Sequence, residues 1–129
     1  MDDGAVVLDA SALMAALRSE PGGERVAPLL DGGHLSAVNL SEVQAKLVEQ
    51  GLPPEELAEA TAGLGLAVHA FDEDMARRAA VLRPATRARG LSLGDRACLA
   101  LAAALGLPAV TADRTWAGVE VGVEIRLVR

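Results

Sequence analysis

The sequence of 129 residues has few of the features that mark several protein classes. A single cysteine, Cys98, excludes a scaffold built on disulfide bonds. The longest unbroken apolar run, residues 97–105, is far shorter than the roughly 20 residues that a membrane helix needs. The absence of any short repeat excludes collagen-like and low-complexity chains. Residues 1–3, MDD, are acidic where a secretory signal is basic, so we expect a cytoplasmic protein with no membrane partner.

Motifs of two large enzyme groups are also missing. The sequence contains no G-x-S-x-G nucleophile elbow, which argues against a serine hydrolase. It contains neither G-x-x-x-x-G-K-[ST] nor G-x-G-x-x-G, which argues against a nucleotide cofactor. His34 and His69 have no cysteine or histidine partners at the spacing of a zinc site, which favours structural or surface roles for both.

Hydrophobic residues make up 51% of the chain, which is enough for a real core and excludes intrinsic disorder. The length fits one domain that covers residues 1–129. Short apolar runs, which we interpret as strands, occur at residues 5–8, 34–38, 66–71, 109–111 and 124–128. Amphipathic or buried helices are expected between them. This alternation predicts an α/β fold with a central, mostly parallel sheet of four to five strands flanked by helices.

The charge of the chain is unevenly distributed. A net charge of −6 argues on average against a nucleic-acid partner, because cationic side chains drive phosphate binding. Residues 77–96, however, contain six arginines and a single acid, Asp95, and therefore carry a net charge of +5. The planar guanidinium group of arginine suits phosphate and carboxylate recognition. GC-rich coding could explain the bias towards arginine, but it does not explain the clustering. The stretch is thus a candidate contact for phosphate groups, with a solvated face as the plain alternative.

Four acids are expected at one edge of the predicted sheet. Asp9 ends the first strand and Asp113 follows the fourth. Glu42 and Asp95 lie in the first turns of predicted helices, and both helices should begin at the carboxyl edge of the strands. Ligands of open α/β sheets bind at that edge. Topology therefore gathers four carboxylates that are far apart in the sequence.

Four carboxylates without basic partners repel one another, so one of them must protonate or a cation must fill the gap. Hard oxygen ligands select Mg²⁺ or Mn²⁺. Such an ion makes a water easier to deprotonate and neutralises charge on a phosphate under attack. An acidic cavity beside an arginine-rich stretch therefore predicts hydrolysis of phosphodiester bonds.

Each acid also has a local explanation. Residues 39–42 and 92–95 both read as capping boxes, and Asp9 and Asp113 could be simple caps or turn residues. Taken together these explanations weaken, because Asp9 ends an apolar run and Asp95 opens a helix that is apolar almost all round. Ions at the edge of a core are costly unless they are paired or liganded. The four acids together therefore favour a metal site.

Four segments of the sequence resemble motifs of one family. They are VVLDASAL at 6–13, NLSEV at 39–43, LSLGDRACLALA at 91–102 and TADRTW at 111–116. In this order and at these separations, they are similar to PIN-domain ribonucleases, specifically VapC toxins of type II toxin–antitoxin systems. The resemblance implies a single PIN-like domain and an endoribonuclease that depends on Mg²⁺ or Mn²⁺. It further implies direct hydrolysis of RNA that leaves 5′-phosphate and 3′-hydroxyl ends.

The same resemblance assigns residues and partners. The acids that it implies as both catalytic and metal-binding are Asp9, Glu42, Asp95 and Asp113. Ser11 and Thr111 match hydroxyl positions that assist the site. A homodimer and a VapB-like antitoxin, whose tail blocks the site, are implied as well. The candidate contacts for RNA or antitoxin are Arg77, Arg78, Arg83, Arg87, Arg89, Arg96 and Arg114.

Two alternatives belong to other functional classes. A receiver-like Mg²⁺-binding signalling domain needs paired acids after its first strand and a lysine late in the chain. Here Asp2 and Asp3 precede that strand, and the only lysine, Lys46, comes early. A non-catalytic α/β interaction module is the second alternative, and it predicts that Asp9→Asn and Asp113→Asn change no activity.

Overall fold

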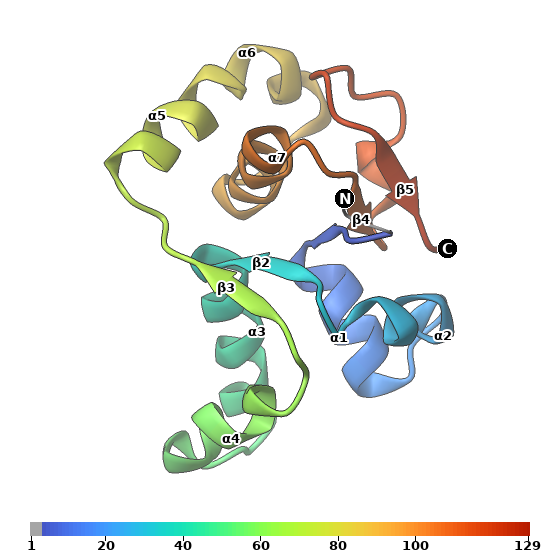
Figure 1. Cartoon of the computed structure of the whole chain (residues 1–129), viewed down its shortest axis with the longest axis vertical. Coiled ribbons are helices and arrows are strands. Elements are labelled where there is room, and N and C mark those ends of the chain that lie inside the picture. The colour runs from blue at the N-terminus through green and yellow to red at the C-terminus, as the bar shows by residue number, and fades with distance from the viewer. Residues whose placement is uncertain (1–3) are drawn as a thin grey trace.

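The computed structural model describes residues 4–129, so residues 1–3, on which the argument against a secretory signal rests, lie outside it. Five short strands form one sheet in the order β3-β2-β1-β4-β5, and every neighbouring pair is parallel (Figure 1). The strands are β1 Val7–Leu8, β2 His34–Ser36, β3 Ala67–His69, β4 Ala109–Thr111 and β5 Ile125–Leu127. The predicted α/β fold is therefore confirmed. Some strands are shorter than expected because flanking residues already belong to loops and helix caps.

Helices cover both faces of the sheet, with α1 to α4 on one side and α5 to α7 on the other (Figure 1). Their bounds are α1 Ala10–Arg18, α2 Gly23–Val26, α3 Ala37–Glu49, α4 Leu57–Ala62, α5 Glu73–Val81, α6 Arg83–Thr86 and α7 Leu93–Leu105. Four short 3₁₀ turns are Ala27–Leu29, Pro54–Glu56, Arg87–Arg89 and Arg114–Trp116. Within residues 4–129 no helix is long and apolar enough to cross a membrane.

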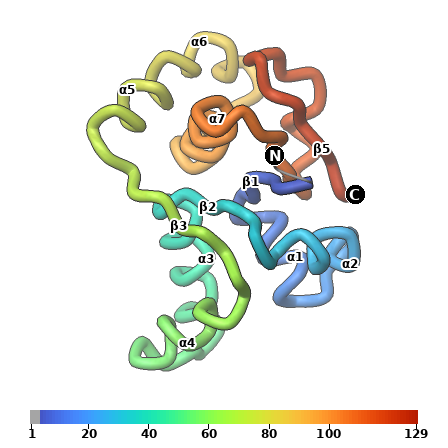
Figure 2. The backbone as a smooth tube through the Cα atoms, viewed as in Figure 1, coloured from blue at the N-terminus to red at the C-terminus, as the bar shows by residue number. Residues whose placement is uncertain are grey.

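The core consists of two clusters separated by the sheet. Val6 and Leu8 belong to the cluster on the α1 and α3 side, and Val7 belongs to the cluster that includes Cys98 and Trp116 of the α7 side. All five side chains are fully buried. This alternation follows the two-residue period of a strand. Strand β1 lies between β2 and β4 in the sheet, next to β2 in Figure 2, and the two core clusters cover its two faces. Asp9, the residue that follows β1, is therefore still buried.

The two histidines are paired with each other across β2 and β3. His34 Nδ1 lies 2.9 Å from His69 Nε2, and the ring centroids are 5.1 Å apart. Burial, followed by the nearby His34, lowers the pKa of His69. A hydrogen bond between neighbouring strands fits the structural role expected for this pair.

Candidate metal centre

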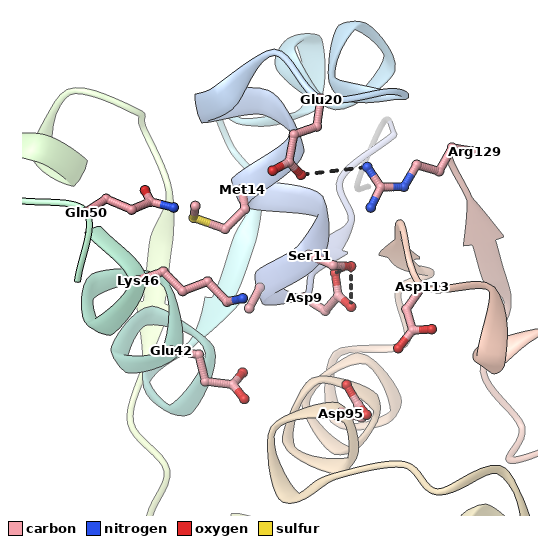
Figure 3. Close-up of a pocket in the computed structure, with 11 residues that line it drawn as sticks. Asp9, Ser11, Met14, Glu20, Glu42, Lys46, Gln50, Asp95, Asp113 and Arg129 are labelled. Carbon is pink, nitrogen blue, oxygen red and sulfur yellow. Dashed lines mark hydrogen bonds and ion pairs between the residues drawn. The ribbon is translucent and has the colours of Figure 1, made fainter. Parts of the chain in front are cut away.

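The four predicted acids line one cavity of about 400 Å³ at the carboxyl edge of the sheet (Figure 3). Asp9 follows β1 directly, and Asp113 comes two residues after β4. Glu42 projects from α3, and Asp95 projects from the first turn of α7. Each acid thus comes from a different part of the chain. The parallel arrangement of the strands and of the helices that feed them brings the four together.

Asp9 is the most buried of the four, with 3% of its surface exposed. Its Oδ1 accepts hydrogen bonds from Ala12 N at 2.8 Å and Ser11 Oγ at 2.9 Å, and its Oδ2 accepts one from Thr111 Oγ1 at 2.6 Å. Burial raises the pKa of Asp9 to about 6. The three hydrogen bonds oppose this shift, and the charge of Asp95 adds to it. The site therefore holds a carboxylate whose negative charge is poorly compensated.

Ser11 and Thr111, the two hydroxyl residues that the family resemblance assigns to the site, connect Asp9 to the neighbouring strand β4 and the residues that follow it. Ser11 Oγ accepts a hydrogen bond from Ala112 N at 2.9 Å and lies 3.2 Å from Thr111 Oγ1. Thr111 Oγ1 in turn accepts a hydrogen bond from Asp113 N at 3.0 Å. The two hydroxyls thus fix the position of Asp9 relative to the segment that carries Asp113.

The capping box expected at residues 39–42, which would explain Glu42 by helix capping alone, does not form. Helix α3 begins at Ala37, because Ser36 Oγ already accepts the hydrogen bond of Val38 N at 3.2 Å and caps the helix three residues earlier than expected. Asn39 therefore lies inside the helix, 1% exposed. Its Nδ2 donates to Glu42 Oε1 at 2.9 Å and to the carbonyl of Gly94 in α7 at 3.0 Å. Asn39 thus links the two helices and holds the carboxylate of Glu42.

The local explanations for Asp95 and Asp113 are confirmed, and both leave an oxygen available. Asp95 forms a capping box with Ser92, in which Asp95 Oδ2 accepts from Ser92 N at 2.8 Å. Asp113 Oδ1 accepts from the backbone N and from Oγ1 of Thr115, at 2.9 and 2.8 Å. Within residues 4–129 the second oxygen of each carboxylate accepts no hydrogen bond. Capping and metal binding are therefore compatible at both positions.

The charges of the acids are not neutralised by ion pairs. Among the described residues, none of the four forms a salt bridge. Burial, followed by the negative charges of Asp9, Asp95 and Glu42, raises the pKa of the Cys98 thiol. Three of the four acids therefore lie close enough together to disfavour negative charge at the same side chain of α7.

The donor set nevertheless has to move to hold an ion. In the part of the chain that the structure describes, no three His, Cys, Asp or Glu side chains are already arranged as ligands of a single metal. The available donors are carboxylate oxygens with uncompensated charge, which is the chemistry that Mg²⁺ and Mn²⁺ prefer. The residues therefore fit a hard divalent ion, and binding would draw their side chains together.

Residues 6–121 match the family model of the PIN domain. The chain belongs to the PIN domain family. The match includes all four sequence motifs and all four acids. The use of divalent metal ions is a general property of this family, and it agrees with the oxygen donors at the edge of the sheet. Family membership also decides against the receiver-like alternative.

Solved structures with the same fold come from toxin–antitoxin systems. A DNA-bound VapBC complex from Salmonella typhimurium contains a chain that is 21% identical, with 97% of this chain and 98% of that chain covered and a TM-score of 0.73. VapC20 from Mycobacterium tuberculosis, a sarcin-ricin loop cleaving toxin, is 17% identical over 93% and 99%, with a TM-score of 0.69. A VapBC-5 structure from the same organism is 25% identical over 98% of both chains, with a TM-score of 0.60. No curated protein sequence matches the chain significantly.

The cavity of this PIN domain also contains groups that the motifs did not identify. Glu20, Lys46, Gln50 and Arg129 line it together with the four acids (Figure 3). Two basic side chains, Lys46 and Arg129, therefore line the cavity, although neither forms a salt bridge with one of the four acids within residues 4–129. Arg129 Nη1 lies 3.6 Å from Glu20 Oε1. The spacing of four residues between Glu42 and Lys46 on one helix is a signal that could have found Lys46, whereas no sequence signal places Arg129 here.

The predicted arginines lie outside the lining of this cavity. Several of them bind other parts of the PIN domain: Arg77 and Arg78 pair with Asp74, Arg89 donates to the carbonyl of Ala117, Arg96 to that of Ala79, and Arg114 to that of Arg129. Arg83 and Arg87 are exposed and form neither a hydrogen bond nor a salt bridge through their side chains within residues 4–129.

Gly94 leaves the space that the carboxylate of Glu42 occupies. A Cβ at this position would meet both oxygens of that carboxylate. We expect Gly94→Ala to displace Glu42 and break its hydrogen bond to Asn39, because the carboxylate is the movable end of a flexible side chain. The free energy of unfolding should change by less than about 1 kcal/mol, since alanine is the better helix former. RNA cleavage should fall at least about tenfold.

A matched control for this prediction is Gly63→Ala, because an added Cβ there meets open space. Thermal unfolding and RNA cleavage should be measured on both variants. Equal cleavage by Gly94→Ala, Gly63→Ala and the parent protein would contradict a role for the position of Glu42.

Proposed function

We propose that this PIN domain is a metal-dependent endoribonuclease of the VapC type. The observation that carries the proposal is that four carboxylates from four separate elements line one cavity without a salt bridge among the described residues. A cluster of this kind is costly to maintain for stability alone. Its position at the ligand-binding edge of an α/β sheet supports a catalytic role.

The proposed metal ligands are Asp9, Glu42, Asp95 and Asp113. A bound Mg²⁺ or Mn²⁺ would neutralise charge on the phosphodiester and favour deprotonation of the attacking water. Ser11 and Thr111 fix Asp9 by hydrogen bonds, and Asn39 fixes Glu42. The polar cavity has room for a phosphodiester and water beside the acids. The chain's own contribution is therefore to position its carboxylates around the phosphate and the water.

The proposed partners are RNA, a VapB-like antitoxin and a second copy of the chain. Structures with the same fold include VapBC complexes and a sarcin-ricin loop cleaving toxin, which supports the first two. Arg83 and Arg87 are the proposed contacts of the arginine-rich stretch, because their side chains are not engaged by other described residues. The homodimer rests on the resemblance to VapC toxins.

The test is cleavage of a broad pool of RNA by the purified chain in the presence of Mn²⁺ or Mg²⁺. We expect cleavage that stops with EDTA, returns with excess Mn²⁺ and leaves 5′-phosphate and 3′-hydroxyl ends. The double variant Asp9→Asn/Asp113→Asn, purified in the same way, controls for contaminating ribonuclease. Intact RNA across the whole pool, with a folded protein and either ion, would favour the non-catalytic module instead.

A further inference from the structure

Helix α3 and the residue that caps its C-terminus direct three polar side chains into the same cavity. Glu42 and Lys46 lie four residues apart on α3, Gln50 is the C-cap residue four positions further on, and all three line the cavity. Residues four apart lie on the same side of a helix, each about 6 Å further along its axis. The wall of the cavity therefore carries an acid and then a cation from α3, followed by an amide from its C-cap.

Lys46 is the only lysine of the chain, and its ammonium group points into the cavity (Figure 3). Although four acids line the same cavity, Lys46 forms neither a salt bridge nor a side-chain hydrogen bond within the described part of the chain. The other cation of the cavity, Arg129, is engaged, since its Nη1 lies near Glu20 and donates to the carbonyl of Pro21 at 3.2 Å. Lys46 is thus the available cation of the cavity.

A polyanion that enters an acidic cavity needs cations beside the acids. A metal ion can compensate the phosphate that is cut, but the neighbouring phosphates of the strand still face Asp9, Glu42, Asp95 and Asp113. A lysine ammonium is a compact charge on a flexible stem and binds phosphate without demanding one geometry. A position one helical turn from Glu42 suits such a contact.

We propose that Lys46 is a substrate-positioning residue that binds the RNA phosphate next to the scissile one. The RNA strand then runs along α3 from Glu42 towards Gln50. This inference rests on the proposed nuclease function and adds to it the path of the RNA backbone through the site. Lys46 then binds the RNA backbone, whereas the four carboxylates bind the metal ion.

The experiment measures binding of a fluorescein-labelled oligouridylate to the Asp95→Asn protein in excess Mn²⁺, because this variant is expected not to cleave RNA and the ion compensates the scissile phosphate. Lys46→Met is compared with Arg25→Met in this background. Both substitutions remove one positive charge. Arg25 is exposed on α2 and lies outside the cavity lining, so Arg25→Met controls for the change in net charge alone. We expect Lys46→Met to weaken binding roughly five- to tenfold near physiological salt. The slope of log K against log [NaCl] should fall by about 0.7, the value for one lost phosphate contact on a single strand.

Lys46→Arg should bind nearly as well as the parent, because it keeps the charge. In cleavage assays with Mn²⁺ on the chain that retains Asp95, Lys46→Met should raise KM much more than it lowers kcat. The same affinity and salt slope for Lys46→Met and Arg25→Met would overturn the inference and leave Lys46 as a counter-charge for the acids. Absence of RNA binding by the Asp95→Asn protein that keeps Lys46 would overturn it as well, and the Mn²⁺ cleavage assay on the chain that retains Asp95 then reports separately whether the nuclease function fails.

Discussion

Asp95→Asn should abolish RNA cleavage while leaving the fold intact. The amide oxygen of asparagine can still accept the hydrogen bond from Ser92 N that closes the capping box, so α7 keeps its first turn. The substitution removes one of the four negative charges from the cavity, which lowers metal affinity and relieves repulsion in the metal-free protein. We expect cleavage to fall more than about 100-fold, beyond the effect of losing an outer-shell partner of a metal. Without metal, the unfolding temperature should stay the same or rise.

Ser92→Ala is the matched control, because it breaks the other half of the same capping box and keeps the carboxylate of Asp95. It should cost about 1 kcal/mol of stability and preserve most of the cleavage. If Asp95 serves only as a helix cap, the two variants will have similar, small effects on cleavage. A rate close to that of the parent for Asp95→Asn would remove Asp95 from the site.

Asp9→Asn should stabilise the metal-free protein, and the gain should depend on pH. Burial raises the pKa of Asp9 from 3.8 to about 6 in the folded chain, so the folded state binds this proton more tightly than the unfolded state. Protonation of Asp9 makes its full contribution to the free energy of unfolding below about pH 4, and this contribution is lost progressively as the pH rises to about 6. Above that pH the charged form costs up to about 3 kcal/mol, which the asparagine variant avoids. We therefore expect its advantage to grow between pH 4 and 6 and then to remain constant.

The measurement is chemical unfolding of both proteins in EDTA at several pH values. Asp72→Asn is the control, because Asp72 caps α5 through a hydrogen bond from Met75 N, as Asp9 caps α1, but it is exposed and distant from the cavity lining. Asp72→Asn should give no comparable gain. An Asp9→Asn protein that is less stable than the parent at pH 7 would show that the hydrogen bonds of the carboxylate outweigh its burial.

The fold and the gathering of the acids were predictable because both depend on chain order and hydrophobic pattern. The apolar run that ends at Asp9 predicted a buried strand, and β1 is covered by helices on both faces. Helix α7, Leu93–Leu105, includes Asp95 in its first turn as the sequence predicts, and Ser92 and Gly106 cap its two ends. Parallel connections then determine at which edge each acid lies. None of these steps needs knowledge of a side-chain contact.

The contacts that position the acids were not predictable, because they join residues that only the folded chain brings together. The sequence around Asn39 fits a capping box, and only the earlier cap at Ser36 and the carbonyl of Gly94 show that its amide links two helices. Arg129 enters the cavity through contacts with Glu20 and Pro21, more than 100 residues away. Local spacing contains no information about such pairs.

The most direct test of the account is the unfolding temperature of the metal-free chain during titration with Mn²⁺ at pH 7. If the four carboxylates are the site of a divalent ion, the unfolding temperature should rise with Mn²⁺, and the stabilisation should reach about 2.7 kcal/mol at 100 times the dissociation constant. Asp95→Asn should lose most of this rise, and NaCl at the same ionic strength should not reproduce it. Equal responses of the parent and Asp95→Asn, or no response of either, would contradict the central claim.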